Sequence, residues 1–385
     1  MKPQTPLHTV LIFRIGSLGD TLVALPAFHL IRECYPDSQI VLLTNTPVNG
    51  GMKAAPSHQI LMGSGLVDEY IDYPHLNVGL AEFVKLAGVI RKLRPSVSFY
   101  LMPVRSVGQR IRDTLFFAAA GLLHVNGLWP GFDGNQHRPV AGRPEQRESE
   151  ASRLLRSVGF DPARLQQSLF SLGIQPAERA SVQSMLHDLG AARRFIALSV
   201  GAKVAAKDWG QDRWFELLEL LRESYGDHAL VFLGSGDEFE RCQLLLNIWP
   251  SGGRNFCGQL SPRQSAAVLE RADLFVGHDS GPMHLASSTG IPSVSIFAAR
   301  DKPGVWFPFG NEENVFYNLV PCHNCRLSVC VEEQMVCIRT IRPIDVAERI
   351  NFLLATTEPN NVSDLTHRVL NGTALDTAQR EATPT

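Results

Sequence analysis

The sequence has almost no excess charge and no long apolar run. Its 385 residues include 36 lysines and arginines against 38 aspartates and glutamates, which gives a formal net charge of -2. Proteins that wrap nucleic acid carry a basic excess, so this class is disfavoured. The first apolar stretch is interrupted by Arg14, Gly16 and Asp20, and we expect neither a signal peptide nor a membrane span there. A cytoplasmic location follows as the expectation.

Cysteine is scarce and unevenly spread, and no fixed-period repeat is visible. Of the seven cysteines, three are scattered and four lie between Cys322 and Cys337, unlike the framework of a secreted disulfide protein. The lack of a repeat disfavours a solenoid. Apolar residues (44%), glycine (31) and proline (24) are plentiful, as in a globular enzyme with many turns. A chain of this length suits two domains.

Short apolar runs alternate with helical patterns in the first half of the chain. A β-rich run over residues 8–15 leads into a glycine turn, then a helical pattern over 22–31 and a second strand at 39–44. The alternation recurs more weakly over residues 67–102. Runs of this kind are typical of a parallel sheet covered on both faces. We therefore predict a doubly wound α/β domain and bound it at residues 1–175.

A polar segment separates this half from a second α/β alternation. The segment begins at residue 131, is rich in Gly, Pro, Arg and Glu, and continues as a helical stretch with little β signal. Apolar strands resume at 195–200 and recur as far as 293–297. This predicts a second doubly wound domain over residues 176–355. The sequence then loses apolar periodicity, which predicts a flexible tail over 356–385.

An Asp-Ser-Gly-Pro turn opens a helix in the second half. Asp279 or Ser280 can cap this helix, and Pro282 suits its first turn. Gly281 lets another group approach the backbone, and His284 projects from the first turn, where it can donate to a phosphate. Free amide groups and the helix dipole favour anions at this end. The turn therefore predicts a diphosphate site, with a well-capped structural helix as the equal alternative.

Two other strand-to-helix turns of the second half carry charged side chains. Lys207 lies in the loop after a strand, and ligands of open α/β sheets bind outside the carboxyl ends of strands. We expect Lys207 and the turn at Asp279 to share one crevice, where the ammonium would neutralise phosphate charge. Glu238 follows a Gly-Ser-Gly turn and could accept hydrogen bonds from ribose hydroxyls. A solvated lysine and an acid at a helix start are the alternatives.

The glycine turn of the first half lacks the third glycine of the dinucleotide fingerprint, and no acidic partner follows the second strand. A nicotinamide-dependent enzyme is therefore disfavoured. The turn presents one carboxylate, Asp20, at the top of the predicted sheet. This aspartate can be a general base for an acceptor hydroxyl, or a helix cap, which its sequence position favours.

The four clustered cysteines follow the spacing Cys-x2-Cys-x4-Cys-x6-Cys. Four thiolates this close in sequence could bind a structural zinc or iron ion, and His323 could replace one of them. Free or transiently paired thiols are the alternative in a cytoplasmic protein. The candidate metal ligands are Cys322, Cys325, Cys330 and Cys337.

Four spaced motifs occur in a fixed order along the chain. They are the run from Ile12 to Pro26, the element Lys207-Asp-Trp209 with Trp214, the run from Gly277 to Ala286, and Asp301-Lys-Pro303 with Pro308-Phe-Gly310. Together they resemble glycosyltransferase family 9, the bacterial ADP-heptose:lipopolysaccharide heptosyltransferases. The cysteine run is also similar to that of the branch that adds the second heptose.

The resemblance implies a GT-B fold, in which two Rossmann-like domains face each other across a cleft. An N-terminal acceptor domain and a C-terminal nucleotide-sugar domain would carry out an inverting transfer without a metal ion. Asp20 matches the family's proposed base, and Lys207 matches a lysine that contacts the donor phosphate. Lys203 stands where many members carry a small hydroxyl residue. The implied donor-binding residues are Lys203, Glu238, Asp279, Ser280, Gly281 and His284, and the implied acceptor-binding residues are Gly19, Arg105 and Arg110.

The expected reaction is transfer of a heptose from ADP-heptose to the inner core of lipopolysaccharide, with Asp20 as general base. The acceptor would be Kdo-lipid A or a heptosyl acceptor. The expected partners are the nucleotide sugar and a lipid-linked saccharide acceptor at the inner membrane. We expect no catalytic cofactor, no nucleic acid and no transmembrane segment, and a cytoplasmic protein that associates peripherally with the membrane. Arginines near the first domain could bind phosphorylated lipid A and Kdo, although solvated arginines are the alternative.

Three alternatives to this reaction remain open. The chain could be a glycosyltransferase that uses another nucleotide sugar on a protein or another surface glycan. It could be a nucleotide-sugar hydrolase or epimerase, because GT-B epimerases share the two-domain scheme. It could also be a non-catalytic protein that binds a nucleotide or a metal ion.

Overall fold

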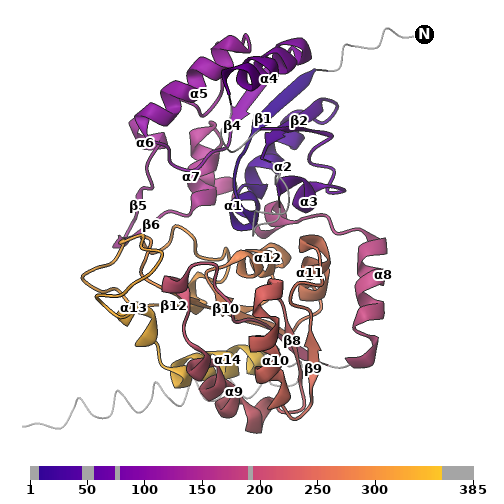
Figure 1. Cartoon of the computed structure of the whole chain (residues 1–385), viewed down its shortest axis with the longest axis vertical. Helices are drawn as coiled ribbons and strands as arrows, with labels where there is room; N and C mark the ends of the chain where they lie inside the picture. The colour runs from indigo at the N-terminus through magenta and orange to yellow at the C-terminus, as the bar shows by residue number, and fades with distance from the viewer. Residues whose placement is uncertain (1–7, 46–55, 74–78, 190–193, 358–385) are drawn as a thin grey trace, which may run out of the picture.

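Two parallel sheets, one in each half of the chain, organise the structure (Figure 1). The computed structural model describes residues 8–45, 56–73, 79–189 and 194–357. The first sheet lies in the upper part of Figure 1 and the second in the lower part, each with helices on both faces. This is the doubly wound α/β architecture that the sequence predicts.

The first sheet has the strand order β3-β2-β1-β4 and is parallel throughout. Its two central strands are short apolar runs that are buried along nearly their whole length. Burial on both faces is what parallel strands require, because crossover helices cover them. The strands are β1 (Thr9–Phe13), β2 (Gln39–Thr44), β3 (Glu69–Asp72) and β4 (Val97–Tyr100).

Helices α2 and α7 cover one face of the first sheet, and α4 and α5 cover the other. Phe117 of α5 packs edge-on against Phe13 of β1, with ring centroids 5.4 Å apart. The helices of this half are α1 (Leu18–Val23), α2 (Leu25–Cys34), α3 (Ser57–Leu61), α4 (Leu80–Leu93), α5 (Val107–Ala119), α6 (Gly131–Gly134) and α7 (Glu150–Ser157).

The second sheet has the strand order β12-β11-β10-β7-β8-β9 and is also parallel. The chain enters at β7, adds β8 and β9 on one side, and then returns to place β10 on the other side. The switch point therefore lies between β7 and β10, where such sheets bind ligands. The strands are β7 (Phe195–Ser199), β8 (Ala229–Phe232), β9 (Gly253–Asn255), β10 (Leu274–His278), β11 (Ser293–Phe297) and β12 (Val315–Tyr317).

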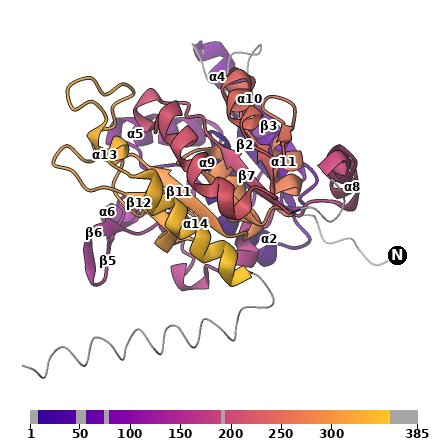
Figure 2. The same cartoon turned by 90° about the horizontal axis from the view of Figure 1, so that it is seen from below.

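Helices α9, α10 and α14 cover one face of the second sheet, while α11 and α12 cover the face toward the first half. Figure 2 shows α9 and α14 running side by side beneath the sheet. The helices are α8 (Pro176–Met185), α9 (Gln211–Tyr225), α10 (Phe239–Asn247), α11 (Pro262–Leu269), α12 (Gly281–Thr289), α13 (Val336–Arg339) and α14 (Pro343–Thr357).

The two halves contact each other through α1 and α12, and one apolar cluster includes side chains from both. A short antiparallel hairpin, β5 (Pro139–Val140) and β6 (Arg143–Arg147), also reaches the second half. There the Arg147 N–H donates to the Pro303 carbonyl. The sequence indicates only a polar segment here, and the hairpin within it was not predicted. Its polar, exposed strands are held by backbone pairing, which leaves no apolar alternation to detect.

Helix α14 runs to Thr357, two residues into the predicted tail, and the rest of the tail lies outside the described residues. Among the described residues, no helix combines the length and the apolar character needed to cross a bilayer.

Candidate functional site

A cavity of about 1000 Å³ lies between the two halves, at the carboxyl ends of the second sheet's strands. Its floor is formed by the loops after β7, β8 and β10, and its opposite wall by the start of α1 and by α3. This size accommodates a large small-molecule ligand. The position is the one that the switch point between β7 and β10 favours. We call this space the donor cavity, after the nucleotide-sugar donor that the resemblance implies for these residues.

The turn before α12 contributes its backbone to the donor cavity. Ser280, Gly281 and Pro282 line the cavity, and Ser280 is the N-cap of α12. The Ser280 hydroxyl is buried and has no hydrogen-bond partner among the described residues. A helix N-terminus with free amides and an unused hydroxyl is suited to bind an anion. The predicted anion site at this turn therefore has the required geometry.

Lys203 and Lys207 occupy different environments. Lys203 lines the donor cavity. The Lys207 ammonium instead contacts the Asp279 carboxylate and lies 3.5 Å from the Asp279 carbonyl oxygen, with both side chains largely buried. Neither Lys207 nor Asp279 is among the residues that line the cavity. The structure thus brings Lys207 to the predicted turn, as a partner of Asp279, and places Lys203 on the cavity wall.

Glu238 projects into the donor cavity between two glycines. A Cβ atom at Gly201 or at Gly234 would meet its carboxylate, so the Glu238 side chain packs directly against both glycines. Ser235 donates to Oε1 at 3.1 Å, while Oε2 is buried without a partner among the described residues. Burial raises the pKa of Glu238. A buried acceptor oxygen that lacks a donor is suited to a ligand hydroxyl.

An ion pair beside Glu238 was not predicted from the sequence. Arg241 donates to both oxygens of Asp208, at 2.6 and 2.9 Å, and both residues line the donor cavity. Burial alone would raise the pKa of Asp208, but the hydrogen bonds from Arg241 and the Gly210 N–H lower it. Arg241 lies on an amphipathic helix and Asp208 in a loop, 33 residues apart, and only the fold brings them together.

His278 supports the donor cavity from inside the sheet. Its Nδ1 is 3.1 Å from the Gly201 carbonyl oxygen, and its Nε2 accepts a 3.1 Å hydrogen bond from the Trp209 N–H. These contacts require a neutral ring protonated on Nδ1. Burial lowers the pKa of His278 to about 4, which keeps it in this form. His278 therefore fixes the loop that carries Lys203 and Lys207.

His284 and Gly19 meet at the contact between α1 and α12. A Cβ atom at Gly19 would lie 2.7 Å from Cδ2 of His284, and one at Gly281 would lie 2.7 Å from Cδ2 of Leu18. These glycines therefore allow the two helices to approach closely. His284 lines a smaller cavity of about 270 Å³, and burial lowers its pKa. Gly19 lines the donor cavity, whereas His284 is not among its lining residues.

Asp20 combines a capping contact with partial exposure. Its Oδ2 accepts hydrogen bonds from the Ser17 N–H and hydroxyl, both at 2.7 Å. Oδ1 lies 3.9 Å from the Arg14 guanidinium, and no described residue donates a hydrogen bond to it. The side chain is 26% exposed. The capping interpretation is therefore correct for one oxygen, while the other is accessible to a ligand.

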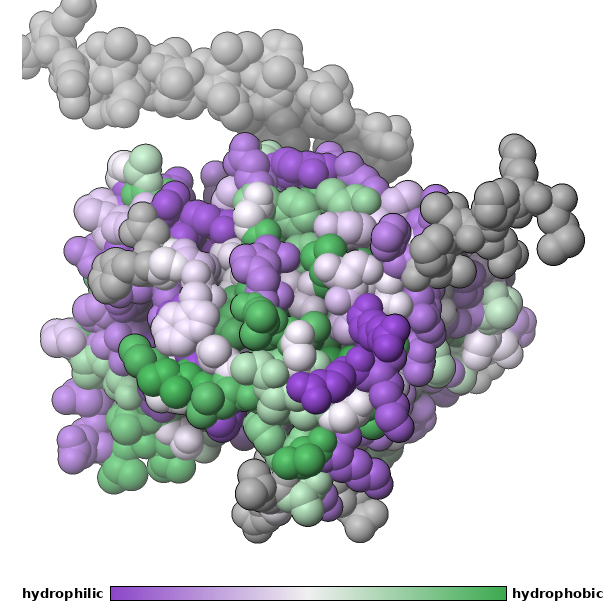
Figure 3. Space-filling view, turned by 90° about the horizontal axis from the view of Figure 1, so that it is seen from above, coloured by the Kyte–Doolittle hydropathy of each residue, from purple (hydrophilic) through white to green (hydrophobic). Residues whose placement is uncertain are grey.

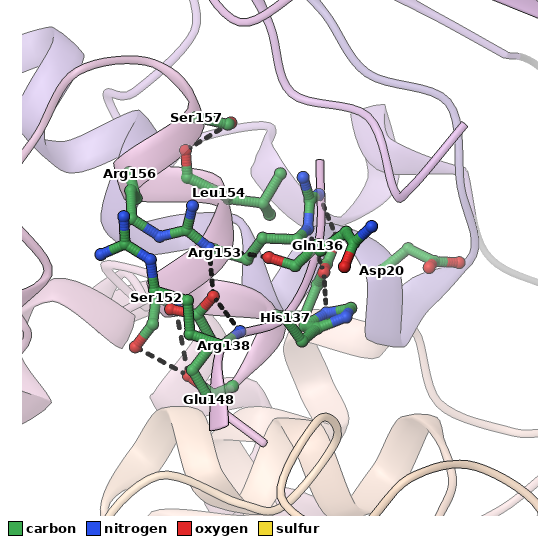
Figure 4. Close-up of polar contacts among 12 residues, drawn as sticks. Asp20, Gln136, His137, Arg138, Glu148, Ser152, Arg153, Leu154, Arg156 and Ser157 are labelled. Atoms are coloured by element: carbon green, nitrogen blue, oxygen red, sulfur yellow. Dashed lines mark hydrogen bonds and ion pairs between the residues drawn. The ribbon is translucent and has the colours of Figure 1, made fainter. Parts of the chain in front are cut away.

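A buried ionic cluster lies beside Asp20, as Figure 4 shows. Arg153 donates to both oxygens of Glu150 at 2.7 Å, and His137 is 2.8 Å from the same carboxylate. Burial alone would raise the pKa of Glu150, but Arg153 and His137 lower it to about 2. Arg153 also donates to the Met102 carbonyl at 2.7 Å, just after β4. The cluster therefore ties α7 to the end of the first sheet.

The two predicted acceptor arginines lie apart from the donor cavity. Arg110 is 6% exposed, donates to the Leu128 carbonyl at 2.9 Å and stacks over the Trp129 ring. Arg105 is partly exposed, and its Nε is buried without a partner among the described residues. The contacts of Arg110 are those of a packed arginine.

The fold gathers the four clustered cysteines. Cys322, Cys325, Cys330 and Cys337 line one space of about 20 Å³. Burial raises the pKa of Cys337. No group of three or more His, Cys, Asp or Glu side chains in the described part of the chain is arranged to hold a metal ion. A structural zinc or iron at this cluster stays a prediction, which metal analysis with thiol titration tests.

Two Rossmann-like halves with a ligand cavity at their facing edges are the arrangement of the GT-B fold. The family model described as "Glycosyltransferase family 9 (heptosyltransferase)" matches residues 154–336. This match agrees with the family that the sequence motifs predict.

Known proteins similar to this chain agree with that assignment. Lipooligosaccharide heptosyltransferase 2 of Campylobacter jejuni is 23% identical over 345 residues, which cover 88% of this chain and 95% of that protein. The structure of a family 9 glycosyltransferase from Veillonella parvula has a TM-score of 0.68 at 17% identity, covering 92% of this chain and 99% of that one. The ADP-heptose heptosyltransferase II of Escherichia coli has a TM-score of 0.63 at 19% identity, covering 90% and 98%.

Proposed function

We propose that the chain transfers a heptose from ADP-heptose to the inner core of lipopolysaccharide, with inversion at the anomeric carbon. The observation that carries the proposal is the donor cavity. A single ligand in it can contact helix amides, a lysine and a carboxylate oxygen that has no hydrogen-bond donor among the described residues. The choice of heptose and acceptor follows the similar proteins, a lipooligosaccharide heptosyltransferase and an ADP-heptose lipopolysaccharide heptosyltransferase.

The nucleotide end of the donor matches three groups of the cavity. The diphosphate binds at the N-terminus of α12, where Ser280 and the free amides supply donors. Lys203 adds a positive charge on the facing loop. Glu238 accepts hydrogen bonds from the ribose hydroxyls through its unused Oε2. Transfer in this arrangement needs no metal ion, because the amides and Lys203 neutralise the charge on the departing ADP.

Asp20 is the general base of the proposed reaction. Its Oδ1 takes the proton of an acceptor hydroxyl while the hydroxyl oxygen attacks the anomeric carbon. The bond between that carbon and the phosphate oxygen breaks on the opposite face, and ADP leaves. Ser17 fixes the carboxylate through Oδ2, so that Oδ1 points away from the cap. Lys207 acts through Asp279 by holding the turn before α12 in position.

Nucleotide binding tests the donor half of the proposal. Thermal shift with ADP, UDP and GDP should show the largest stabilisation with ADP. Glu238→Gln should weaken ADP binding by about 10-fold, because a hydrogen bond to a charged group is lost. Glu240→Gln is the matched control, since Glu240 is exposed on the next turn and does not line the cavity. Equal shifts with the three nucleotides, or equal effects of the two variants, would contradict this donor site.

A lipid-linked acceptor requires the protein to reach a membrane surface, and α5 offers a suitable face. Val107, Ile111 and Leu115 are spaced four residues apart on α5 and are 63%, 49% and 65% exposed. The Trp129 ring is 52% exposed next to this helix, where its Nε1 donates to Thr114. Figure 3 views the molecule from above, toward α4 and α5, and shows hydrophobic groups between hydrophilic ones.

Cations accompany this apolar stripe. Arg112 of α5 is 52% exposed, and Lys85 and Lys92 are exposed on the neighbouring α4. Aliphatic and tryptophan side chains with interspersed cations are typical of surfaces that bind anionic bilayers. We therefore propose peripheral association with the inner membrane through α5.

Vesicle sedimentation tests this association. The protein should bind vesicles of anionic phosphatidylglycerol better than neutral phosphatidylcholine vesicles, and the binding should weaken with salt. Ile111→Glu should reduce binding several-fold. Leu244→Glu is the control, since Leu244 is 56% exposed on α10, outside this face. Equal binding by both variants would contradict the role of α5.

A further inference from the structure

A second interdomain cavity, of about 560 Å³, is lined by two cations that have no ion-pair partner in the described part of the chain. Its first-half wall includes His137 and Glu150, and its second-half wall includes Lys302 and Trp306. The segment that carries the four cysteines contributes Asn324 and Arg326 to the same wall. We call this space the second cavity. It shares no lining residue with the donor cavity.

The acids of the second cavity are neutralised and two of its cations are not. Glu150 is paired with Arg153, and Asp301 lies 3.2 Å from the Arg300 guanidinium. The Lys302 ammonium and the Arg326 guanidinium form no ion pair or side-chain hydrogen bond with any described residue. The net field of the cavity therefore favours an anion.

The cysteine-bearing segment is held against the cavity in an unusual backbone conformation. Asn324 and Arg326 have φ values of 61° and 56°, the left-handed region. The Asn324 N–H donates to the Ala299 carbonyl at 2.7 Å, and the Arg326 N–H donates to the Arg300 carbonyl at 3.0 Å. Arg300 returns a hydrogen bond to the Arg326 carbonyl at 3.0 Å. Non-glycine residues kept in this region are a feature of functional sites.

Asn324 also leaves an acceptor unused. Its Oδ1 is buried and has no hydrogen-bond partner among the described residues. Buried amide oxygens are nearly always paired, so an orphaned one at a cavity wall is suited to accept from a ligand. A saccharide hydroxyl is such a donor. The cavity thus offers two cations and one hydroxyl acceptor within a single segment and the loop beside it.

The second cavity adjoins the site of the proposed chemistry. Trp306, on its wall, packs edge-on against His284 with ring centroids 6.3 Å apart. His284 in turn contacts Gly19, which lines the donor cavity and precedes Asp20. These contacts link the second cavity to the start of α1, where Gly19 precedes Asp20. Asp20 and Glu150, which lines the second cavity, also both act electrostatically on Arg14. The proposed base therefore lies close to this cavity.

We propose that the second cavity binds an anionic group of the acceptor saccharide, a carboxylate or a phosphate. Lys302 and Arg326 bind the anion, and Asn324 Oδ1 accepts from a neighbouring hydroxyl. The cysteine-bearing segment is then part of acceptor recognition, which gives this segment a role independent of any metal. The inference rests on the proposed function, because it names the acceptor subsite of that reaction.

Steady-state kinetics of Lys302→Gln and Arg326→Gln test the subsite, with Arg339→Gln as control. Arg339 is exposed on α13, close in sequence, and does not line the cavity. The acceptor is an inner-core saccharide, either heptose-free or carrying one heptose, used in its native form, with carboxyl groups reduced to alcohols, and with phosphates removed. Each subsite variant should raise the acceptor KM by roughly 10-fold to 100-fold, with the donor KM and kcat nearly unchanged. The control should match the wild type.

The modified acceptors identify the anion. If the carboxylate is the ligand, the difference between the wild type and the two variants should disappear with the carboxyl-reduced acceptor, which all three proteins use equally poorly. If the phosphate is the ligand, the dephosphorylated acceptor shows this behaviour instead. Calorimetric binding of the native saccharide to Asp20→Asn protein, with and without Arg326→Gln, should give the same loss of affinity without turnover.

Two outcomes would overturn the subsite. One is a wild-type acceptor KM in both Lys302→Gln and Arg326→Gln, and the other is an equal rise of donor and acceptor KM, which indicates a general structural defect. Neither outcome contradicts the proposed transfer reaction, since the wild-type protein would still catalyse it. Failure of the wild type to glycosylate any of the three acceptors would instead overturn the proposed function.

Discussion

Replacement of Glu150 by glutamine removes the negative charge of a buried cluster and leaves Arg153 without a counter-ion. The side chains of Glu150 and Arg153 are 1% and 3% exposed. Arg153 and His137 overcome the effect of burial and lower the pKa of Glu150 from 4.5 to about 2, which corresponds to about 3 kcal/mol of stability. Removal of one partner of a buried ion pair costs about 3–5 kcal/mol. We therefore expect Glu150→Gln to lower the free energy of unfolding by about 3–5 kcal/mol.

Guanidinium denaturation at neutral pH measures this loss. Glu270→Gln is the matched control, because Glu270 pairs with Arg179 at the surface, with side chains 27% and 51% exposed, and should lose at most about 1 kcal/mol. The pH dependence provides a second test. The stability from Glu150 is complete above pH 4.5 and is lost as the pH falls toward 2, so Glu150→Gln should lack this slope. A loss below about 1 kcal/mol for Glu150→Gln would mean that this buried ion pair contributes no more than a surface pair, contrary to the prediction.

Two further predictions concern the interior of the site. Burial lowers the pKa of His278 to about 4, below its ordinary 6.5, so the protein should lose up to about 3 kcal/mol of stability as the pH falls from 6.5 toward 4. His278→Gln should not show this loss. Thermal unfolding at pH 7 and pH 5 measures the difference. Gly19→Ala should lower the free energy of unfolding by about 1–3 kcal/mol and reduce heptose transfer, because its Cβ would meet the His284 ring. Gly88→Ala is the control and should leave the stability unchanged, because a Cβ there meets no atom within 4 Å. Equal unfolding free energies for these two alanine variants would contradict the tight contact between α1 and α12.

The sequence predicts the sheets well because their strands are short apolar runs that are buried on both faces. It also predicts the turn before α12, because Ser, Gly and Pro each fit one position of a helix start. The hairpin β5–β6 could not be predicted, since its polar residues pair through the backbone alone. These differences follow from what a local pattern contains: burial leaves a periodic signal, and backbone pairing at the surface does not.

The contacts of the site are less accessible to sequence reasoning. Lys207 was expected at a phosphate, and the structure shows its partner to be Asp279, 72 residues later in the chain. Arg110 belongs to a group of arginines that the sequence cannot sort, because only the fold places it on the Trp129 ring. Glu150 and His137 carry no motif at all. Pairs that are distant in sequence depend on tertiary packing, and a single sequence holds no record of them.

A mass-spectrometric assay of heptose transfer tests the proposed reaction itself. Purified protein is incubated with ADP-heptose and an inner-core saccharide that is either heptose-free or carries one heptose, and mass spectrometry follows the addition of one heptose. The wild type should form this product only with an acceptor, and Asp20→Asn should be slower by roughly two to four powers of ten while ADP affinity is kept. Transfer at an unchanged rate by Asp20→Asn, or consumption of ADP-heptose without an acceptor, would contradict the proposed reaction.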